Sequence, residues 1–80
     1  MPTKAYVLIE TTVGRSREIA NKLYEIEGVE TVDQVTGPYD LIAVVKRLDL
    51  NSVGDLVTNQ IPVIDGIART VTCLIMNAQE

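Results

Sequence analysis

The residues that could carry out catalysis are few in this chain. It has no histidine, and Cys73 is its single cysteine. Without histidine, the usual zinc sites and imidazole acid–base chemistry are excluded. One cysteine excludes both an intramolecular disulfide and a cysteine cluster for a metal. Cys73 falls in the middle of a predicted strand, where we expect it to pack in the core. The sequence therefore predicts no catalytic residue, metal or cofactor, and a protein that is not an enzyme.

Two short stretches have residues suited to binding instead. The turn Gly37-Pro38-Tyr39-Asp40 combines a glycine, which permits close approach of the backbone, with a tyrosine and a carboxylate. Thr70 and Thr72 lie two residues apart in a predicted strand, so both hydroxyls should lie on one face of the sheet. Each has a simpler interpretation. Asp40 can merely close its own turn, and threonine is common in strands.

The rest of the chain supplies the elements that position these stretches. Composition and periodicity predict strands over residues 4–10, 29–36, 41–46 and 67–76. A helix with Ser16 as its N-cap precedes Gly28, and Ile19, Ala20, Leu23 and Ile26 recur along it at helical spacing. A second helix, capped by Asp49 or Asn51, ends at Pro62, with Leu50, Val53, Leu56, Val57 and Ile61 along one face.

The predicted order of elements is β-α-β-β-α-β, and the chain repeats itself. Each helix leads into an acidic residue, a glycine and a β-branched residue that begins a strand, at residues 27–29 and 65–67. Two right-handed βαβ units joined by a hairpin predict an α+β ferredoxin-like sandwich. Its antiparallel sheet should have the order 4-1-3-2, with both helices on one face. Eighty residues make this a single domain, 1–80.

The other face of this sheet is predicted to be apolar as well. A face exposed to solvent should carry polar side chains in alternation, but the central strands are apolar at nearly every position. Soluble monomers rarely expose such a patch, so we expect a homodimer that buries it. The residues assigned to this interface are Tyr6, Leu8, Ile42, Val44, Leu74 and Met76.

Charge and hydropathy limit where the protein is expected to be located and which classes of partner it can bind. The net charge is −4, and the seven basic residues are scattered, which argues against direct binding of nucleic acid. No stretch has the length of a transmembrane helix, and the apolar run at residues 5–9 is too short for a signal peptide. We therefore expect a cytoplasmic protein that does not bind membranes.

Two motifs in this order resemble those of the effector-binding domain of Lrp/AsnC transcriptional regulators. Residues 36–41, TGPYDL, are similar to the family's T-G-x-[YF]-D-aliphatic hallmark. Residues 66–72, GIARTVT, are similar to its G-[VI]-x-x-T-x-T signature in the last strand. The resemblance covers essentially the whole chain. It implies a RAM domain, an αβ-sandwich that pairs sheet to sheet and then assembles into rings of dimers, often octamers.

The resemblance also implies a ligand and its site. A free amino acid would bind where dimers meet, lined by Gly37, Tyr39 and Asp40, with Thr70 and Thr72 nearby. Asp40 can pair with the ammonium group, and the carboxylate can be met by backbone N–H groups near Gly37 and by threonine hydroxyls.

One departure from the family's pattern concerns DNA binding. Family regulators carry an N-terminal helix-turn-helix domain, whereas this sequence begins at the first strand. It is thus expected to be a stand-alone RAM protein that acts on transcription by co-assembling with full-length relatives. The alternatives are a small dimeric ferredoxin-like enzyme and a purely structural oligomer without a ligand.

Overall fold

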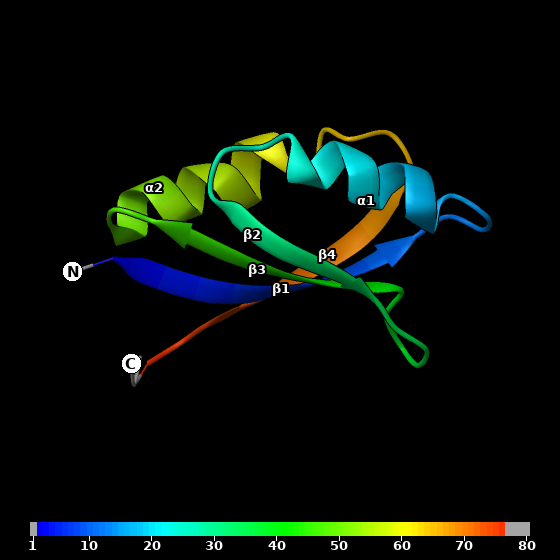
Figure 1. Ribbon diagram of the computed structural model, residues 1–80, viewed down its shortest axis with the longest axis horizontal. Coiled ribbons are helices and arrows are strands. Elements are labelled where there is room, and N and C mark those ends of the chain that lie inside the picture. Colours follow the sequence, from blue (N-terminus) through cyan, green and yellow to red (C-terminus); the bar gives the residue numbers. More distant parts are fainter. Residues whose placement is uncertain (1, 77–80) are drawn as a thin grey trace.

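The protein is a four-stranded antiparallel sheet with its helices on one side, as the computed structural model shows for residues 2–76 (Figure 1). The sheet order is β2-β3-β1-β4, the predicted 4-1-3-2 order in reverse, and the ferredoxin-like βαββαβ fold is confirmed. No helix among these residues is long and apolar enough to span a membrane. The elements in chain order are β1 (Thr3–Thr11), α1 (Ser16–Tyr24), β2 (Val29–Gln34), β3 (Leu41–Arg47), α2 (Leu50–Asp55), the π-helical turn η1 (Leu56–Gln60) and β4 (Ile67–Leu74).

The internal repeat is visible in how the two outer strands begin. Gly28 precedes β2 with φ +104°, and Gly66 precedes β4 with φ +103°, a backbone conformation that disfavours any side chain. The carbonyl of Gly28 accepts a hydrogen bond from the N–H of Lys46 at 2.7 Å, and that of Gly66 accepts one from Thr12 at 2.8 Å. In both halves, therefore, a glycine joins the start of an outer strand to the end of a central strand.

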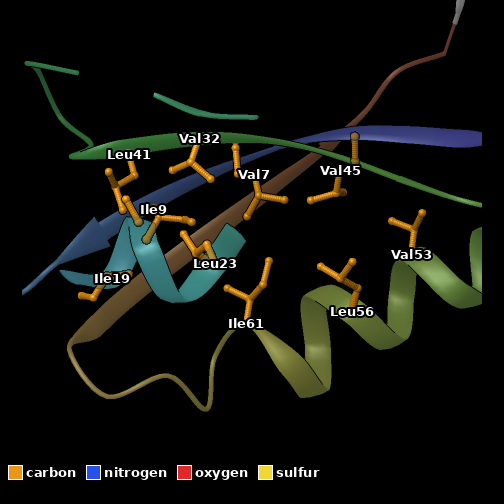
Figure 2. Packing of buried hydrophobic residues seen from close by; sticks show 13 residues of the cluster. Val7, Ile9, Ile19, Leu23, Val32, Leu41, Val45, Val53, Leu56 and Ile61 are labelled. Atoms are coloured by element: carbon orange, nitrogen blue, oxygen red, sulfur yellow. The ribbon is translucent and has the colours of Figure 1, made fainter. Parts of the chain in front are cut away.

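The hydrophobic core lies between the sheet and the helices. Alternate residues of the central strands point into it, and Figure 2 shows Val7 and Ile9 of β1 facing Leu23 of α1. Ala5 of β1 is buried in the same cluster. Leu41, Ala43 and Val45 of β3 are fully buried in the same layer, together with Ile19, Val53, Leu56 and Ile61 from the helical side. In the two central strands, the residues that alternate with those assigned to the other sheet face are therefore the buried ones, as their positions in the sequence imply.

The second helix changes its pitch to keep its apolar residues in this core. Leu56 and Ile61 are both fully buried, although they are five positions apart in the sequence. An α-helix would place Gln60 under Leu56. Here the N–H of Ile61 instead bonds to the carbonyl of Leu56 at 3.0 Å, the i→i+5 pattern of a π-turn, and so Ile61 faces the sheet. Leu50, predicted on the buried face, is 56% exposed.

The second sheet face carries no element among the described residues. Tyr6 and Leu8 of β1 pair directly with Val44 and Ile42 of β3, so these four side chains share this face. We call it the open face. Figure 1 shows it below the sheet, opposite the helices. Tyr6 is 47% exposed, while Leu8, Ile42 and Val44 are half-buried by their neighbours.

The prediction for β4 was wrong in its choice of face. Cys73 pairs with Tyr6, and Val71 with Leu8, so both belong to the open face, and Cys73 is exposed rather than part of the core. Leu74 pairs with Ala5 and therefore lies on the helix side, where it is 47% exposed. Met76 lies beyond the last residue of β4 and is 97% exposed. Leu74 and Met76 at this end of the edge strand are therefore both exposed.

Several element boundaries differ from the prediction, and β1 and β3 extend one residue beyond the predicted ranges at Thr3, Thr11 and Arg47. Ser16 is the first residue of α1 and not its cap; Arg15 occupies the N-cap position without a side-chain hydrogen bond to the helix backbone. Arg15 instead bonds Glu18, which lowers the pKa of that carboxyl, and Asp65 at 3.0 Å. Strand β2 ends at Gln34 and β4 at Leu74, each two residues earlier than predicted. Asp49 caps α2 as expected, accepting the Ser52 N–H at 2.8 Å.

Candidate functional site

The connection between β2 and β3 is a loop at one end of the sheet. It is closed by a hydrogen bond from the N–H of Val35 to the carbonyl of Asp40, 3.0 Å long. Gly37 at its tip has φ +140°, and a Cβ placed on it would meet nothing within 4 Å. Figure 1 shows the loop projecting past the sheet, on the side away from the helices. The loop therefore offers exposed backbone close to the open face.

Asp40 is fixed to the neighbouring strand rather than to its own turn. Its Oδ2 accepts the N–H of Thr11 at 2.8 Å and the Thr11 hydroxyl at 3.2 Å. Its own N–H donates to the carbonyl of Ile9 at 2.9 Å. The side chain thus extends the β1–β3 ladder by one bond where the register of β1 with β4 shifts, between Glu10 and Thr11. The simpler interpretation, in which Asp40 only closes its own turn, does not account for the hydrogen bonds to Thr11.

The side chain of Tyr39 contacts Arg69 of β4. The guanidinium carbon of Arg69 lies 5.4 Å from the centre of the Tyr39 ring, within cation–π range, and its Nη2 donates to the tyrosine hydroxyl at 3.3 Å. Arg69 Nε also lies 3.4 Å from Glu10 Oε1. Glu10 and Arg69 are direct partners across β1 and β4, on the same face as Tyr6 and Leu8. We call Glu10, Tyr39 and Arg69 the corner cluster.

Thr70 and Thr72 share one face of β4, as predicted, but that face is not the one of the corner cluster. They pair with Ile9 and Val7, whose side chains point into the core, so both threonines lie on the helix side. Thr70 is half-buried and Thr72 is exposed. Within one chain the sheet therefore separates these two hydroxyls from the ring of Tyr39. The structure brings Tyr39 and Asp40 together in one loop but does not add the threonines to them.

The sequence reasoning missed three residues at this end of the sheet. The predicted first strand ended at residue 10, one residue before Thr11, which supplies both donors to Asp40. Glu10 was given no role of its own, and Arg69 was counted only among the scattered basic residues. Arg69 lies within the second motif, one residue before Thr70, and a basic residue beside a binding motif was the available signal. Nothing in the local sequence pointed to Thr11.

A shallow, open hollow of about 480 Å³ lies elsewhere, around the end of β3 and the start of α2. Gly28, Lys46, Arg47, Leu48 and Ser52 are among the residues that line it. Arg47 Nε is occupied there by the carbonyl of Glu27 at 2.8 Å. The hollow shares no residue with the loop or the corner cluster, so the described geometry gives two separate regions, of which only the loop contains the predicted residues.

A family model matches the sequence, and solved structures match the fold. The model of the Lrp/AsnC ligand-binding domain matches residues 4–79. The chain belongs to the Lrp/AsnC family. This confirms the resemblance inferred from the two motifs.

Individual relatives agree with the assignment. The HTH-type transcriptional regulator LysM of Saccharolobus solfataricus is 30% identical over 74 residues, 91% of this chain and 51% of the relative. This chain thus spans about half the length of that regulator. A Thermus thermophilus structure is 36% identical with a TM-score of 0.90, covering 98% of both chains. A hypothetical protein of Pyrococcus horikoshii is 30% identical with a TM-score of 0.87, covering 96% of this chain and 92% of its own.

Proposed function

We propose that this Lrp/AsnC domain is an oligomeric regulatory module that binds a free amino acid at the loop between β2 and β3. The observation that carries this proposal is the family's hallmark turn at the end of the sheet, beside an apolar face, with Gly37 and Pro38 exposed and Tyr39 and Asp40 half-buried. Each dimer would bring two such loops to its surface, and the effector would bind where dimers meet. We propose a cytoplasmic location, because the named relative is a transcriptional regulator.

The chemistry of the loop suits an amino acid. Asp40 offers a carboxylate for the ammonium group, and Thr11 bonds only its Oδ2. The exposed backbone at Gly37 permits close approach of a ligand, although Pro38 provides no N–H. A Neisseria meningitidis transcriptional regulator with this fold (15% identical, TM-score 0.85) was crystallised as an L-Met complex. That complex supports an amino acid as the ligand class.

The assembly would begin with the open face. Tyr6, Leu8, Ile42 and Val44 form its centre, and the pairing of β4 adds Val71 and Cys73. Burying such a face against a second copy stabilises by roughly 25 cal/mol per Å² of apolar area, which matters for a domain this small. Leu74 and Met76 lie outside this centre, at the end of β4. We propose the dimer as the building block of a higher oligomer, with an octamer as the expected size.

An effect on transcription would require a partner that reads DNA. LysM is about twice as long as this chain, and their shared region is the ligand-binding domain. The same open face would let this chain pair with the corresponding domain of a full-length relative. We therefore propose co-assembly with such regulators and no direct binding to DNA. Failure of co-expressed, differently tagged chains to co-purify would remove this part of the proposal.

A catalytic role receives no support from the loop. The groups near Tyr39 are a phenol, carboxylates, a guanidinium and hydroxyls, and the chain has no histidine to act as a base. We propose that the protein is not an enzyme. The remaining alternative is a structural oligomer that has kept the loop without a ligand.

A thermal-shift screen against the twenty amino acids separates the sensor from the structural oligomer. A ligand that binds only the native state raises stability by about 2.7 kcal/mol at one hundred times its Kd. We expect one or a few amino acids to raise the Tm, and Asp40→Asn to abolish the rise. Asparagine can still accept the Thr11 N–H but has no charge for the ammonium group. No hit at millimolar concentration would contradict ligand binding.

A further inference from the structure

Arg69 combines an ion pair, a hydrogen bond and a cation–π contact in one side chain. It reaches from β4 across the end of β1, where Glu10 holds its Nε, and its Nη2 bonds the hydroxyl of Tyr39 in the hallmark loop. The ring of Tyr39 lies under the guanidinium group. Three contacts therefore fix one cation beside the loop. We infer that Arg69 receives the carboxylate of the bound amino acid, an inference that rests on the proposed function.

The position of the two threonines leaves this role unfilled. The sequence suggested that their hydroxyls meet the effector's carboxylate, but Thr70 and Thr72 lie on the helix side of β4. Arg69 extends from the same strand on the opposite side, toward Tyr39. Pro38 removes one of the backbone N–H groups that could serve instead. Among residues 2–76, Arg69 is the cation whose side chain contacts the loop, and so it is the candidate partner for a carboxylate.

The loop has both anionic and cationic side chains nearby, as a ligand with an ammonium and a carboxylate group requires. Asp40 and Glu10 are anionic, Arg69 is cationic and paired with Glu10, and Tyr39, the residue before Asp40 in the loop, contacts Arg69. A guanidinium group has five donors in a planar fork that suits a carboxylate. Here Nε is ion-paired with Glu10 and Nη2 donates to the tyrosine hydroxyl, so Nη1 remains for a ligand. Its side chain is 59% exposed, which leaves access from solvent or from a neighbouring subunit.

The other interpretation of Arg69 is an ordinary surface ion pair. Exposed pairs add little to stability, so stability alone does not distinguish the two roles. The chemical group on the ligand does. An amino acid and its C-terminal amide share the side chain and the ammonium group, and they differ only in the carboxylate that Arg69 would bind. The ratio of their affinities therefore reports on this contact and not on the stability of the fold.

The test measures binding of the twenty L-amino acids and of the matching L-amino-acid amides. Calorimetry on the wild-type chain should show a preference for the acid of about 10- to 100-fold, the effect of one charge-assisted contact. In Arg69→Gln the acid should weaken by the same factor while the amide changes little, which brings the ratio near one. The acid-to-amide ratio of Arg69→Lys should lie between those of the wild type and Arg69→Gln. Arg17→Gln is the matched control: Arg17 is an exposed arginine on α1, outside the loop and the corner cluster, so this variant should keep the wild-type ratio.

Each outcome decides between the two proposals. An acid that binds the wild type and keeps its preference over the amide in Arg69→Gln overturns the role of Arg69 and leaves the sensor intact. If the amides bind the wild type as tightly as the acids, the role of Arg69 is likewise overturned and the sensor remains. If neither panel binds, both proposals fail. If Arg69→Gln does not fold, as judged by circular dichroism, the ratio in Arg69→Lys decides, and an unchanged ratio there overturns the inference.

Discussion

Asp40 accepts two hydrogen bonds from Thr11, 29 residues away in sequence, through a single carboxylate oxygen. The contact joins the hallmark loop to the end of β1, so the loop's carboxylate has a structural partner before any ligand arrives. Removing it leaves the N–H of Thr11 without its acceptor. We expect Asp40→Ala to lower the free energy of unfolding by about 1–3 kcal/mol, measured by urea titration. Asp40→Asn keeps an acceptor and should cost less than half as much.

This pair of variants also refines the binding test. Loss of ligand response in Asp40→Ala would mix a disturbed loop with a missing charge, whereas Asp40→Asn mainly removes the charge. Equal destabilisation by the two substitutions would contradict the assigned role of the Asp40–Thr11 contact.

The open face should fail to associate when a charge is placed at its centre. Val44 lies between Tyr6 and Thr31 in the strand register, on this face. Val44→Glu would bury a charge in any sheet-to-sheet dimer, which costs far more than a surface change. We expect it to produce monomers by size-exclusion chromatography. Val13→Glu is the matched control, because Val13 is fully exposed in the β1–α1 loop; it should leave the association unchanged.

Tyr24 protects the edge strand β2. Its hydroxyl accepts the N–H of Val32 at 2.9 Å and donates to the carbonyl of the same residue at 3.3 Å. Tyr24→Phe should lower the stability by about 1 kcal/mol and speed hydrogen exchange at the Val32 amide. Tyr39→Phe removes a hydroxyl from the loop and serves as the control. Exchange at Val32 that is unchanged in Tyr24→Phe would contradict this role.

Gly66 should tolerate a side chain less well than Gly14. Both have positive φ, +103° and +81°, but a Cβ on Gly66 would lie 2.8 Å from Ile19 Cδ1, and one on Gly14 would meet nothing within 4 Å. Gly14→Ala should cost about 1–2 kcal/mol for the backbone alone. Gly66→Ala adds the clash and should cost more in thermal unfolding. A smaller loss for Gly66→Ala would contradict the packing at this junction.

Acid should weaken the cap of α2. The backbone N–H of Ser52 bonds Asp49 and lowers the pKa of its carboxyl below the ordinary value of 3.8. The stabilisation is therefore present above the unfolded-state pKa and is lost as the pH falls through the lower folded-state value. Asp49→Ser retains a neutral cap, so its stability should fall less steeply than wild type between about pH 5 and about pH 2. Parallel curves for the two chains would exclude this contribution.

The element order was predictable because each element has a clear local signal. The helical spacing of Ile19 and Leu23 and the two glycines at residues 28 and 66 mark boundaries that depend only on nearby sequence. The spacing of Val53, Leu56 and Ile61 also contained the π-turn, since no α-helix buries all three on one line. The sequence analysis took this spacing as one face of a regular α-helix and so missed the π-turn.

The face of β4 and the partner of Asp40 could not be predicted in the same way. Both sets of alternating residues in β4 include apolar side chains, so only its register with β1 decides that Cys73 joins Tyr6. That register includes a shift at Glu10 and Thr11, which no local pattern encodes. Thr11 meets Asp40, and Arg69 meets Tyr39, only because the chain brings distant segments to one end of the sheet.

Sedimentation velocity at micromolar concentration, with and without the amino acid that raises the Tm most, tests the central claim most directly. An effector-responsive assembly predicts a wild-type species heavier than the 8.8 kDa chain and a shift in its distribution when the amino acid is added. The shift should be absent in Asp40→Asn. A single 8.8 kDa species under both conditions would contradict the account.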